Sequence, residues 1–251
     1  MRTWIAACRG ALAFLTRLPV GHREGDWDAF RSRPATLPFV GLVAGSLAAI
    51  PLVAVDVLEA PTVALGYLLA VYAVVGIHNL DGVADLGDAL VVHGDRERRR
   101  EVLKDTTTGV GALLAVSLTV GGLALGALGV AELPPATAVG VAIAAEIGAR
   151  LGLAAMACFG TASHEGMGSQ LIEATTPGQF AAPAGIVLGA AVLLWPHPAA
   201  VAVSGALVGV ALPWLWAQRN LGGVSGDVFG AATEIGRVVG LHAGVIAWTL
   251  S

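Results

Sequence analysis

Three aspartates stand at helical spacing at the end of a long apolar stretch: Asp81, Asp85 and Asp88. On a helix, positions i, i+4 and i+7 share one face. Like charges on one face repel one another, and the sequence places no Lys or Arg among these three. Clustered carboxylates are typical ligands of a hard divalent cation such as Mg²⁺, which also binds substrate phosphates. The pattern therefore predicts metal-assisted chemistry on a phosphate-bearing substrate at a membrane surface.

A second group of candidate residues lies near the C-terminus. Gly222, Gly223 and Gly226 form a Gly-Gly-x-x-Gly pattern, whose backbone N–H groups are able to cradle a phosphate oxygen. Asp227 and Glu234 are seven residues apart, which again places them on one helical face. A glycine-rich turn that leads into the last helix is the plainer interpretation. Together with the first three aspartates, the segment predicts two acid-bearing helix ends that share one metal cluster.

Other polar residues have two interpretations each. Asp105 directly precedes an apolar run, so it suits a helix N-cap as well as a metal or phosphate contact. Glu165 and Gly166 belong to a connection without Lys or Arg, which either closes over a substrate or only links two helices. Glu146 and Arg150 form an i, i+4 pair inside an apolar run, where charges are usually paired or functional.

Composition indicates an all-α, polytopic integral membrane protein. Of the 251 residues, 56% are hydrophobic and 13% are charged. A soluble domain carries about twice that charged fraction. We therefore expect residues 1–251 to form a single membrane-embedded catalytic domain that contacts the lipid bilayer and no nucleic acid. The sequence leaves the oligomeric state open and is compatible with a homo-oligomer.

Seven apolar runs are long enough, or nearly long enough, to cross a bilayer, since a span needs about 20 residues. A shorter N-terminal stretch, Trp4–Leu15, suits a helix that lies along the membrane surface. The expected spans are 36–58, 60–78, 109–131, 134–158, 180–195, 198–217 and 235–250.

The distribution of basic residues predicts how the chain lies in the membrane. Three short connections, around Glu59, Glu132 and Pro196, contain no Lys or Arg. The N-terminal region and the connection 79–108 carry most of the basic residues. Under the positive-inside rule, the N-terminus and the long loops face the cytoplasm and the C-terminus faces outward. The arginines between 96 and 100 act as a topological anchor or, alternatively, tether an anionic substrate.

Five segments, in order along the chain, resemble the cobalamin synthase family, whose members are adenosylcobinamide-GDP ribazoletransferases. The residues Phe14 to Val20 resemble the family's opening, and Thr36 to Leu42 resemble the entry to its first span. The segment from His78 to Asp88 resembles its aspartate motif. The segments Glu165-Gly166-Met167-Gly168 and Leu221 to Ala231 resemble its EGxG loop and its C-terminal glycine motif. The chain departs from the family pattern at Thr107 and at Ser163-His164.

The resemblance implies a reaction and a set of roles. It implies that α-ribazole, or its 5′-phosphate, joins adenosylcobinamide-GDP, that GMP leaves, and that adenosylcobalamin or its 5′-phosphate forms. Asp81, Asp85 and Asp88 would bind Mg²⁺, and Asp227 and Glu234 would complete the cluster. One acid would accept a proton if a ribazole hydroxyl is the nucleophile. Lys104 or Arg219 would stabilise charge on the leaving GMP, and substrate contacts would come from Asp105, Glu165, Gly166, Gly222, Gly223 and Gly226.

Two other functions use similar residues. CDP-alcohol phosphotransferases also hold metals with aspartates at helical spacing, but their signature has an Ala-Arg pair where this chain has Ala84-Asp85. A cation-coupled transporter would use the acids to bind ions, typically near the middle of the membrane. The expected cytoplasmic position of the acids favours an enzyme over a transporter.

Overall fold

The computed structural model describes residues 2–105, 107–193 and 197–251, and within these residues the chain is helical without a β-strand. Its longer helices are α1 (Arg2–Leu15), α3 (Thr36–Ala48), α4 (Ala60–Val75), α5 (His78–Val91), α7 (Val110–Ala131), α8 (Pro135–Phe159), α10 (Ala181–Leu193), α11 (His197–Asn220) and α12 (Gly226–Thr249). Short helices connect them: α2 (Asp26–Arg31), η1 (Ile50–Ala54), α6 (Arg96–Val102), α9 (Met167–Glu173) and η2 (Pro177–Phe180).

The chain is a polytopic membrane protein, although the structure does not confirm seven spans. Among the described residues, four helical segments are long and apolar enough to cross a bilayer: Thr36–Ala54, α7, α8 and α11. The count becomes five if α4 and α5 together form one bent span. The expected span 180–195 corresponds to the shorter helix α10, and its residues 194 and 195 lie outside the described residues. The expected span 235–250 lies within α12.

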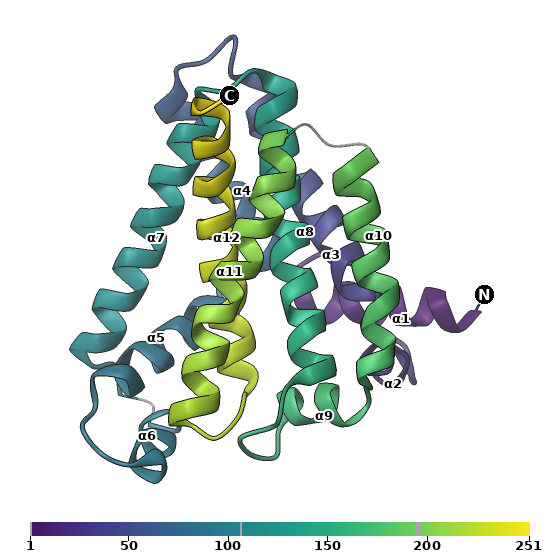
Figure 1. Ribbon diagram of the computed structural model, residues 1–251, viewed down its shortest axis with the longest axis vertical. Coiled ribbons are helices and arrows are strands. Elements are labelled where there is room, and N and C mark those ends of the chain that lie inside the picture. Colours follow the sequence, from purple (N-terminus) through teal and green to yellow (C-terminus); the bar gives the residue numbers. More distant parts are fainter. Residues whose placement is uncertain (1, 106, 194–196) are drawn as a thin grey trace.

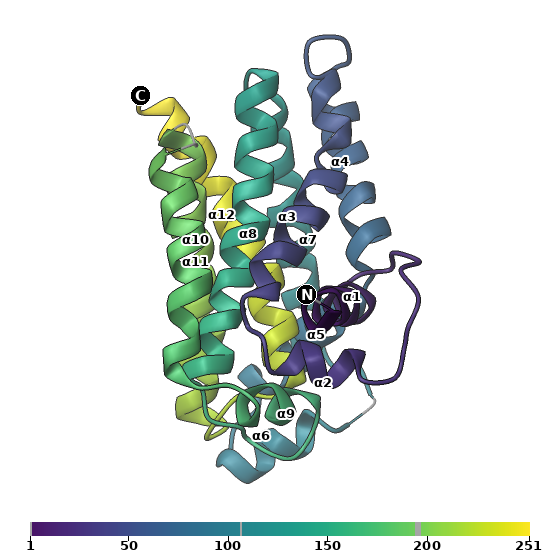
Figure 2. The same ribbon diagram turned by 90° about the vertical axis from the view of Figure 1, so that its right-hand side faces the viewer.

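A sharp bend separates α4 from α5. The two helices meet at 95°, and Gly76, which ends α4, has φ of 75°. This left-handed region favours glycine because a Cβ would be strained there. As a result, α5 does not extend α4 in a straight line. It crosses the lower part of the bundle at about the level of α1 (Figures 1 and 2).

Helix α8 is the central helix of the bundle. In its most apolar window, 89% of the residues are buried, and it packs against α3, α11 and α12. Figure 2 shows these helices lying alongside one another. A helix that is apolar nearly all round is expected in the core of a bundle. The charged residues Glu146 and Arg150 of α8 are therefore buried inside the protein.

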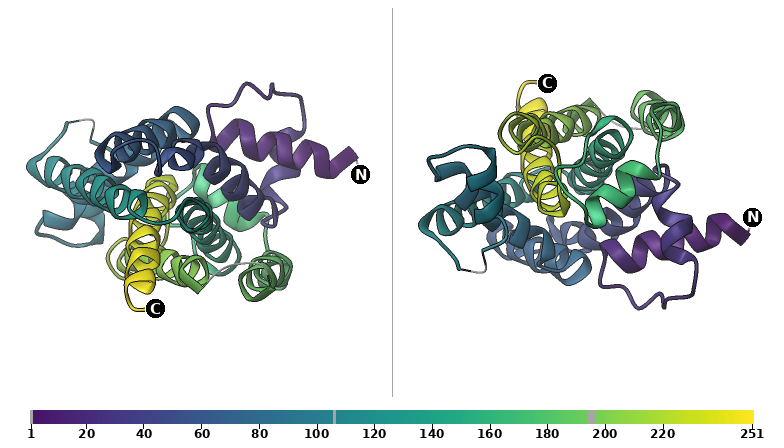
Figure 3. Two further views of the ribbon diagram at one scale, coloured as in Figure 1. Left: turned by 90° about the horizontal axis from the view of Figure 1, so that it is seen from above. Right: turned by 90° about the horizontal axis from the view of Figure 1, so that it is seen from below.

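The short helices α2, α6 and α9 lie at the lower end of the bundle, whereas the C-terminus lies at the upper end (Figure 1). Seen from below, α9 crosses beneath the bundle near the start of α12 (Figure 3). The indole N–H of Trp27 in α2 donates to the amide oxygen of Gln170 in α9 over 2.8 Å. Arg100 of α6 donates to the carbonyl of Leu221 over 2.8 Å. These contacts fix the connecting segments beside the lower ends of α8 and α12.

Helix α12 begins earlier than the hydropathy pattern predicts. The prediction placed 218–234 in a loop, but α11 continues to Asn220 and α12 starts at Gly226. The side chain of Ser225 caps α12 by accepting a hydrogen bond from the backbone N–H of Val228. Such a cap satisfies one of the free donors of a helix start. The polar C-terminal motif is therefore mostly the first turns of a helix, and the loop before it is short.

Candidate active site

The first turn of α12 lies directly against α5, and two glycines allow this contact. A Cβ on Gly82 of α5 would lie 2.4 Å from the carbonyl oxygen of Asp227. A Cβ on Gly230 would lie 3.2 Å from the Cα of Asn79. Because neither residue has a side chain, the two backbones approach closely. This packing brings the acidic face of α5 next to the N-terminus of α12, where Asp227 stands.

The four aspartates have different surroundings. Asp81 is exposed, whereas Asp85, Asp88 and Asp227 are half-buried. Asp227 lies in the first turn of α12, where the helix dipole favours a negative charge, and it accepts a hydrogen bond from the Ser225 hydroxyl over 3.1 Å. The acids of α5 lie on one helical face, as their spacing predicted.

The negative charges of the neighbouring aspartates change the pKa of Asp85. The pKa of the Asp85 carboxyl is raised to about 6, and partial burial is the largest cause. The negative charge of Asp227 adds to the rise, followed by those of Asp81 and Asp88. Neighbouring like charges disfavour ionisation in this way. Carboxylates of both α5 and α12 therefore raise the pKa of Asp85, which means that they interact electrostatically with it.

Asp88 also has a structural role. One of its carboxylate oxygens accepts a hydrogen bond from the backbone N–H of Gly109 over 2.7 Å, and the other accepts from Ala112 over 2.9 Å. Both donors belong to the start of α7, where helix N–H groups lack intrahelical partners. Asp88 therefore joins α5 to the N-terminus of α7. The prediction that it binds a metal stays a prediction.

A cavity of about 450 Å³ adjoins the aspartates. Asp81 and Asp227 line it together with His78, Asn79 and Thr233. Apolar side chains from α1, α3, α8, α9 and α12 form much of the remaining wall: Phe14, Leu15, Leu37, Leu153, Met167, Leu171 and Phe229. The volume is in the range of sites for small organic ligands. The cavity therefore combines acidic side chains with room for part of a substrate.

Several predicted site residues are exposed at the same end of the molecule. Lys104, Asp105, Glu165, Gly166 and Arg219 are all solvent-exposed. The Asp105 carboxylate accepts hydrogen bonds from the backbone N–H and the hydroxyl of Thr107, and these bonds lower the Asp105 pKa. The connection that contains Glu165 leads into α9, whose first residues line the cavity. None of these five residues itself lines the cavity, so the substrate contacts predicted for them stay predictions.

The three glycines of the C-terminal motif have distinct places. Gly222 has φ of 76° and lies against the guanidinium of Arg100. A Cβ on Gly223 would lie 2.5 Å from the carbonyl oxygen of Thr161. Gly226 lines the cavity as the first residue of α12. The first two glycines thus shape the loop before α12, and Gly226 borders the cavity.

Glu234 lies deeper than predicted, in a buried charge cluster. Its carboxylate and that of Glu146 both bind Arg237, and the Arg237–Glu234 contact measures 2.6 Å. The sequence left Glu146 and Arg150 either as an ion pair or as functional residues, and among the described residues no ion pair joins them. Glu146 contacts Arg237 of α12 because the two helices cross at this level. Arg150 instead lines the cavity.

The carboxylates suit a hard cation, although no closed metal site is formed. Among the described side chains, no group of three His, Cys, Asp or Glu residues is arranged to hold a metal ion. Mg²⁺ often uses one or two protein carboxylates and takes its other ligands from water and substrate phosphates. The oxygen donors of Asp81, Asp85 and Asp227 fit this mode of binding, because their mutual repulsion would be relieved by a cation.

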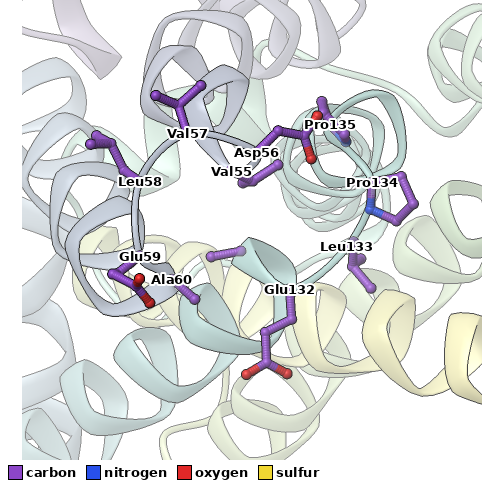
Figure 4. A pocket seen from close by; sticks show the side chains of 11 residues that line it. Val55, Asp56, Val57, Leu58, Glu59, Ala60, Glu132, Leu133, Pro134 and Pro135 are labelled. Atoms are coloured by element: carbon purple, nitrogen blue, oxygen red, sulfur yellow. The ribbon is translucent and has the colours of Figure 1, made fainter.

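A second hollow lies at the opposite end of the bundle. It has a volume of about 760 Å³ and is formed by the loops 55–60 and 131–135, as Figure 4 shows. Its lining includes Asp56, Glu59 and Glu132, and none of the described residues around it is basic. The cavity beside α5 also has acidic residues, but Arg150 in its lining is able to bind a phosphate group. The cavity beside α5 is therefore the better candidate for a phosphate-bearing substrate.

Sequence analysis missed several residues that line the cavity. Asn79, Met167, Gly168 and Thr233 stood within or beside recognised motifs, but nothing in their spacing marked them as wall residues. Gly82, which follows Asp81 in the aspartate motif, was not recognised as a residue that allows close helix packing. Arg150 did carry a signal, because a lone arginine inside an apolar helix is usually functional or paired.

The chain matches known proteins along nearly its whole length. The family model described as cobalamin-5-phosphate synthase matches residues 7–245. A protein from Halorubrum lacusprofundi named adenosylcobinamide-GDP ribazoletransferase is 51% identical over 98% of both chains. Proteins of the same name from Halobacterium salinarum and Haloquadratum walsbyi are 57% and 41% identical, over 75% and 98% of this chain and 96% and 99% of their own. No solved structure matches the chain.

Proposed function

The chain belongs to the cobalamin-5-phosphate synthase family, and we propose that it joins adenosylcobinamide-GDP to α-ribazole or α-ribazole 5′-phosphate. GMP leaves, and adenosylcobalamin or its 5′-phosphate forms. The observation that carries the proposal is the meeting of Asp81 and Asp85 with Asp227 beside a substrate-sized cavity, in a chain with this family match. The family match also favours this reaction over CDP-alcohol phosphotransfer and over ion transport.

The family's name constrains the bond that forms. A cobalamin 5′-phosphate product keeps the phosphate of the ribazole, so a ribazole hydroxyl has to be the nucleophile. Its oxygen bonds to the phosphorus attached to cobinamide, and the bond from that phosphorus to GMP breaks. The hydroxyl proton must go to a base. An aspartate of the cluster would accept this proton, and Lys104 or Arg219 would offset the charge on GMP.

Binding of a diphosphate next to carboxylates requires a cation. Mg²⁺, held by Asp81, Asp85 and Asp227, would neutralise the substrate's diphosphate and fix its position. Asp88 would support this group by holding α5 against α7, in addition to its predicted part as a ligand. The proposed substrate-binding residues remain Asp105, Glu165, Gly166, Gly222, Gly223, Gly226 and Glu234.

The proposed site faces the cytoplasm. Support comes from the basic residues of α6 and its flanks, which lie at the same end of the bundle as the aspartates (Figure 1). Positively charged segments remain preferentially on the cytoplasmic side of a membrane. The C-terminus lies at the other end of the bundle, which supports a C-terminus outside the cell.

The function is tested by turnover of purified protein in detergent or lipid. Adenosylcobinamide-GDP and α-ribazole 5′-phosphate are supplied with Mg²⁺, GMP release is followed, and the corrinoid product is identified by mass. The expected result is one complete corrinoid for each GMP released. Folded protein that releases no GMP would contradict the proposal, and CDP-activated alcohols would then be tested as substrates.

A further inference from the structure

Four charged side chains are buried within the helical bundle, at the level where α8 crosses α12. Glu146, Arg150, Glu234 and Arg237 are all at most 1% exposed. Two are acids and two are bases, but the pairing is uneven. Arg237 contacts both carboxylates. Arg150 contacts neither, and among the described residues its three guanidinium nitrogens have no hydrogen-bond partner.

An unpaired guanidinium in the core is costly. Removing a charge from water carries a penalty of several kcal/mol unless a partner compensates for it. Buried polar groups in native proteins are therefore almost always bonded, and an exception calls for an explanation. Arg150 has five N–H donors available. Because Arg237 already neutralises the local carboxylates in part, Arg150 is positioned to bind an anion from outside the protein.

The cavity connects Arg150 to the aspartates. Arg150 is completely buried in its wall, whereas Asp81 is exposed in the same wall. The two charges are more than 4 Å apart, since no ion pair joins them. The cavity therefore has a cationic inner wall and an acidic side. Apolar residues such as Leu153 also line it.

From this arrangement we infer that Arg150 binds a phosphate group of a substrate at the inner wall of the cavity. The planar guanidinium matches two phosphate oxygens at once, which makes arginine the preferred residue for such contacts. The inference rests on the proposed function for the identity of the substrate, because both substrates carry phosphate: the diphosphate of adenosylcobinamide-GDP and the 5′-phosphate of ribazole. The bound group would extend from Arg150 toward the aspartates.

The first test uses pyrophosphate as a probe and measures thermal unfolding of the detergent-purified full chain. Wild type, R150M and R150K are compared, and R31M serves as a control because Arg31 is in an exposed ion pair outside the cavity. We expect ligand-free R150M to fold, because Arg150 makes no hydrogen bond that the substitution would remove. Pyrophosphate should stabilise wild type and R31M but not R150M.

The opposite results would overturn the inference. If R150M and R150K both fail to fold, Arg150 supports the fold and not a ligand. If pyrophosphate stabilises R150M as much as wild type, the phosphate binds elsewhere. R150K, which keeps the charge but loses the two-oxygen contact, should retain a reduced response; a full response would contradict the bidentate contact.

A second test identifies which phosphate is bound. We expect R150K to raise a KM by roughly 10- to 100-fold, the loss expected for charged hydrogen bonds. A rise for α-ribazole 5′-phosphate but not for α-ribazole assigns Arg150 to the ribazole phosphate. A rise for adenosylcobinamide-GDP with either nucleophile assigns it to the diphosphate. Unchanged KM values for all three would overturn the inference.

The two proposals fail separately. If wild type shows no ribazoletransferase turnover but pyrophosphate stabilises it through Arg150, the proposed function is wrong and the phosphate site stands. If wild type turns over and R150M still binds pyrophosphate normally, the function stands and the inference is wrong.

Discussion

At the scale of single residues, the site depends on a glycine as much as on its acids. Gly82 lies one residue after Asp81, where a Cβ would meet the backbone of Asp227. A backbone carbonyl cannot rotate away as a flexible side chain does. The closeness of α5 and α12, and with it the proximity of their aspartates, therefore requires glycine at this position.

The substitution Gly82→Ala tests this requirement. Alanine is the better helix former by up to about 1 kcal/mol, so a purely local effect would stabilise α5. We expect instead a loss of about 1–3 kcal/mol from overpacking and at least a tenfold loss of turnover. The measurements are thermal unfolding and GMP release.

Gly121→Ala is the matched control, because no atom lies within 4 Å of a Cβ at Gly121 in α7. It should leave turnover unchanged. Wild-type turnover by the Gly82→Ala protein would show that the close contact of α5 and α12 is unimportant for the reaction.

The acids of the site could be predicted from the sequence, whereas the place of Arg150 could not. The spacing of Asp81, Asp85 and Asp88 is a local property of one helix, and α5 has the predicted face. The partner of Glu146 depends on how α8 and α12 cross, which no local spacing encodes. The i, i+4 spacing marked Arg150 as one possible partner of Glu146, and the structure places Arg237 there.

At the scale of elements, Asp88 connects two helices of the site. It accepts hydrogen bonds from two N–H groups of the α7 start, so its loss should weaken the α5–α7 contact. A capping carboxylate replaced by alanine costs about 1 kcal/mol. The predicted second role of Asp88, as a metal ligand, requires the negative charge of the carboxylate as well as its oxygens.

Two variants of Asp88 separate these roles. Asp88→Ala should lower the thermal unfolding temperature, because both hydrogen bonds are lost. Asp88→Asn keeps one acceptor oxygen but turns an NH₂ group toward the other N–H donor, so its stability should lie between those of wild type and Asp88→Ala. Near-normal turnover by Asp88→Asn would indicate a capping role alone. Loss of turnover by Asp88→Asn at a temperature where it stays folded would support metal binding.

The contact of α1 with α2 makes the free energy of unfolding depend on pH. Arg9 donates two hydrogen bonds to the Asp26 carboxylate, of 2.7 and 2.5 Å. These bonds, with a backbone N–H of Arg23, hold the Asp26 pKa below its usual value. A lowered pKa stabilises the fold above the unfolded-state value, about 3.9, and this stabilisation is lost as the pH falls through the lower folded-state value.

We therefore expect Arg9→Gln to be less stable than wild type at pH 6, and the difference should shrink as the pH falls below about 4. Thermal unfolding in detergent from pH 6 to pH 2.5 measures it. Arg31→Gln, which removes an exposed pair, should show almost no difference at any pH. A constant gap between Arg9→Gln and wild type would refute the assignment.

Hydropathy located the helices better than it located their ends. Each of the seven apolar runs contains a helix, but α12 begins several residues before the run that predicted it. Its first turns are polar because they face α5 and the cavity, so an apolar window excludes them. The bend at Gly76 was missed for a related reason, since the residues on both sides belong to helices and the chain turns by 95° at a single glycine.

At the scale of the whole molecule, the two ends of the bundle differ in charge. The aspartates, the basic helix α6 and α9 lie at the lower end, and the C-terminus lies at the upper end (Figure 1). The upper loops carry Asp56, Glu59 and Glu132. This polarity was predictable from sequence, since it follows from which connections contain Lys and Arg. The orientation in the cell follows from it as a prediction.

Single cysteines test the orientation. In a background with Cys8 and Cys158 replaced by serine, Ser251→Cys should react with a membrane-impermeant maleimide on intact cells. Glu165→Cys should react only after the membrane is opened. Both residues are exposed, so burial does not explain a difference. Labelling of Glu165→Cys on intact cells would place the candidate site outside.

The central claim is that acids from α5 and α12 act together on a metal-bound substrate. Its most direct test is GMP release as a function of Mg²⁺ concentration for wild type, Asp81→Asn and Asp227→Asn. We predict that wild type requires Mg²⁺ and that each variant is slower by roughly 10²- to 10³-fold at saturating Mg²⁺, without loss of thermal stability. Wild-type turnover by either variant in excess Mg²⁺ would contradict the account.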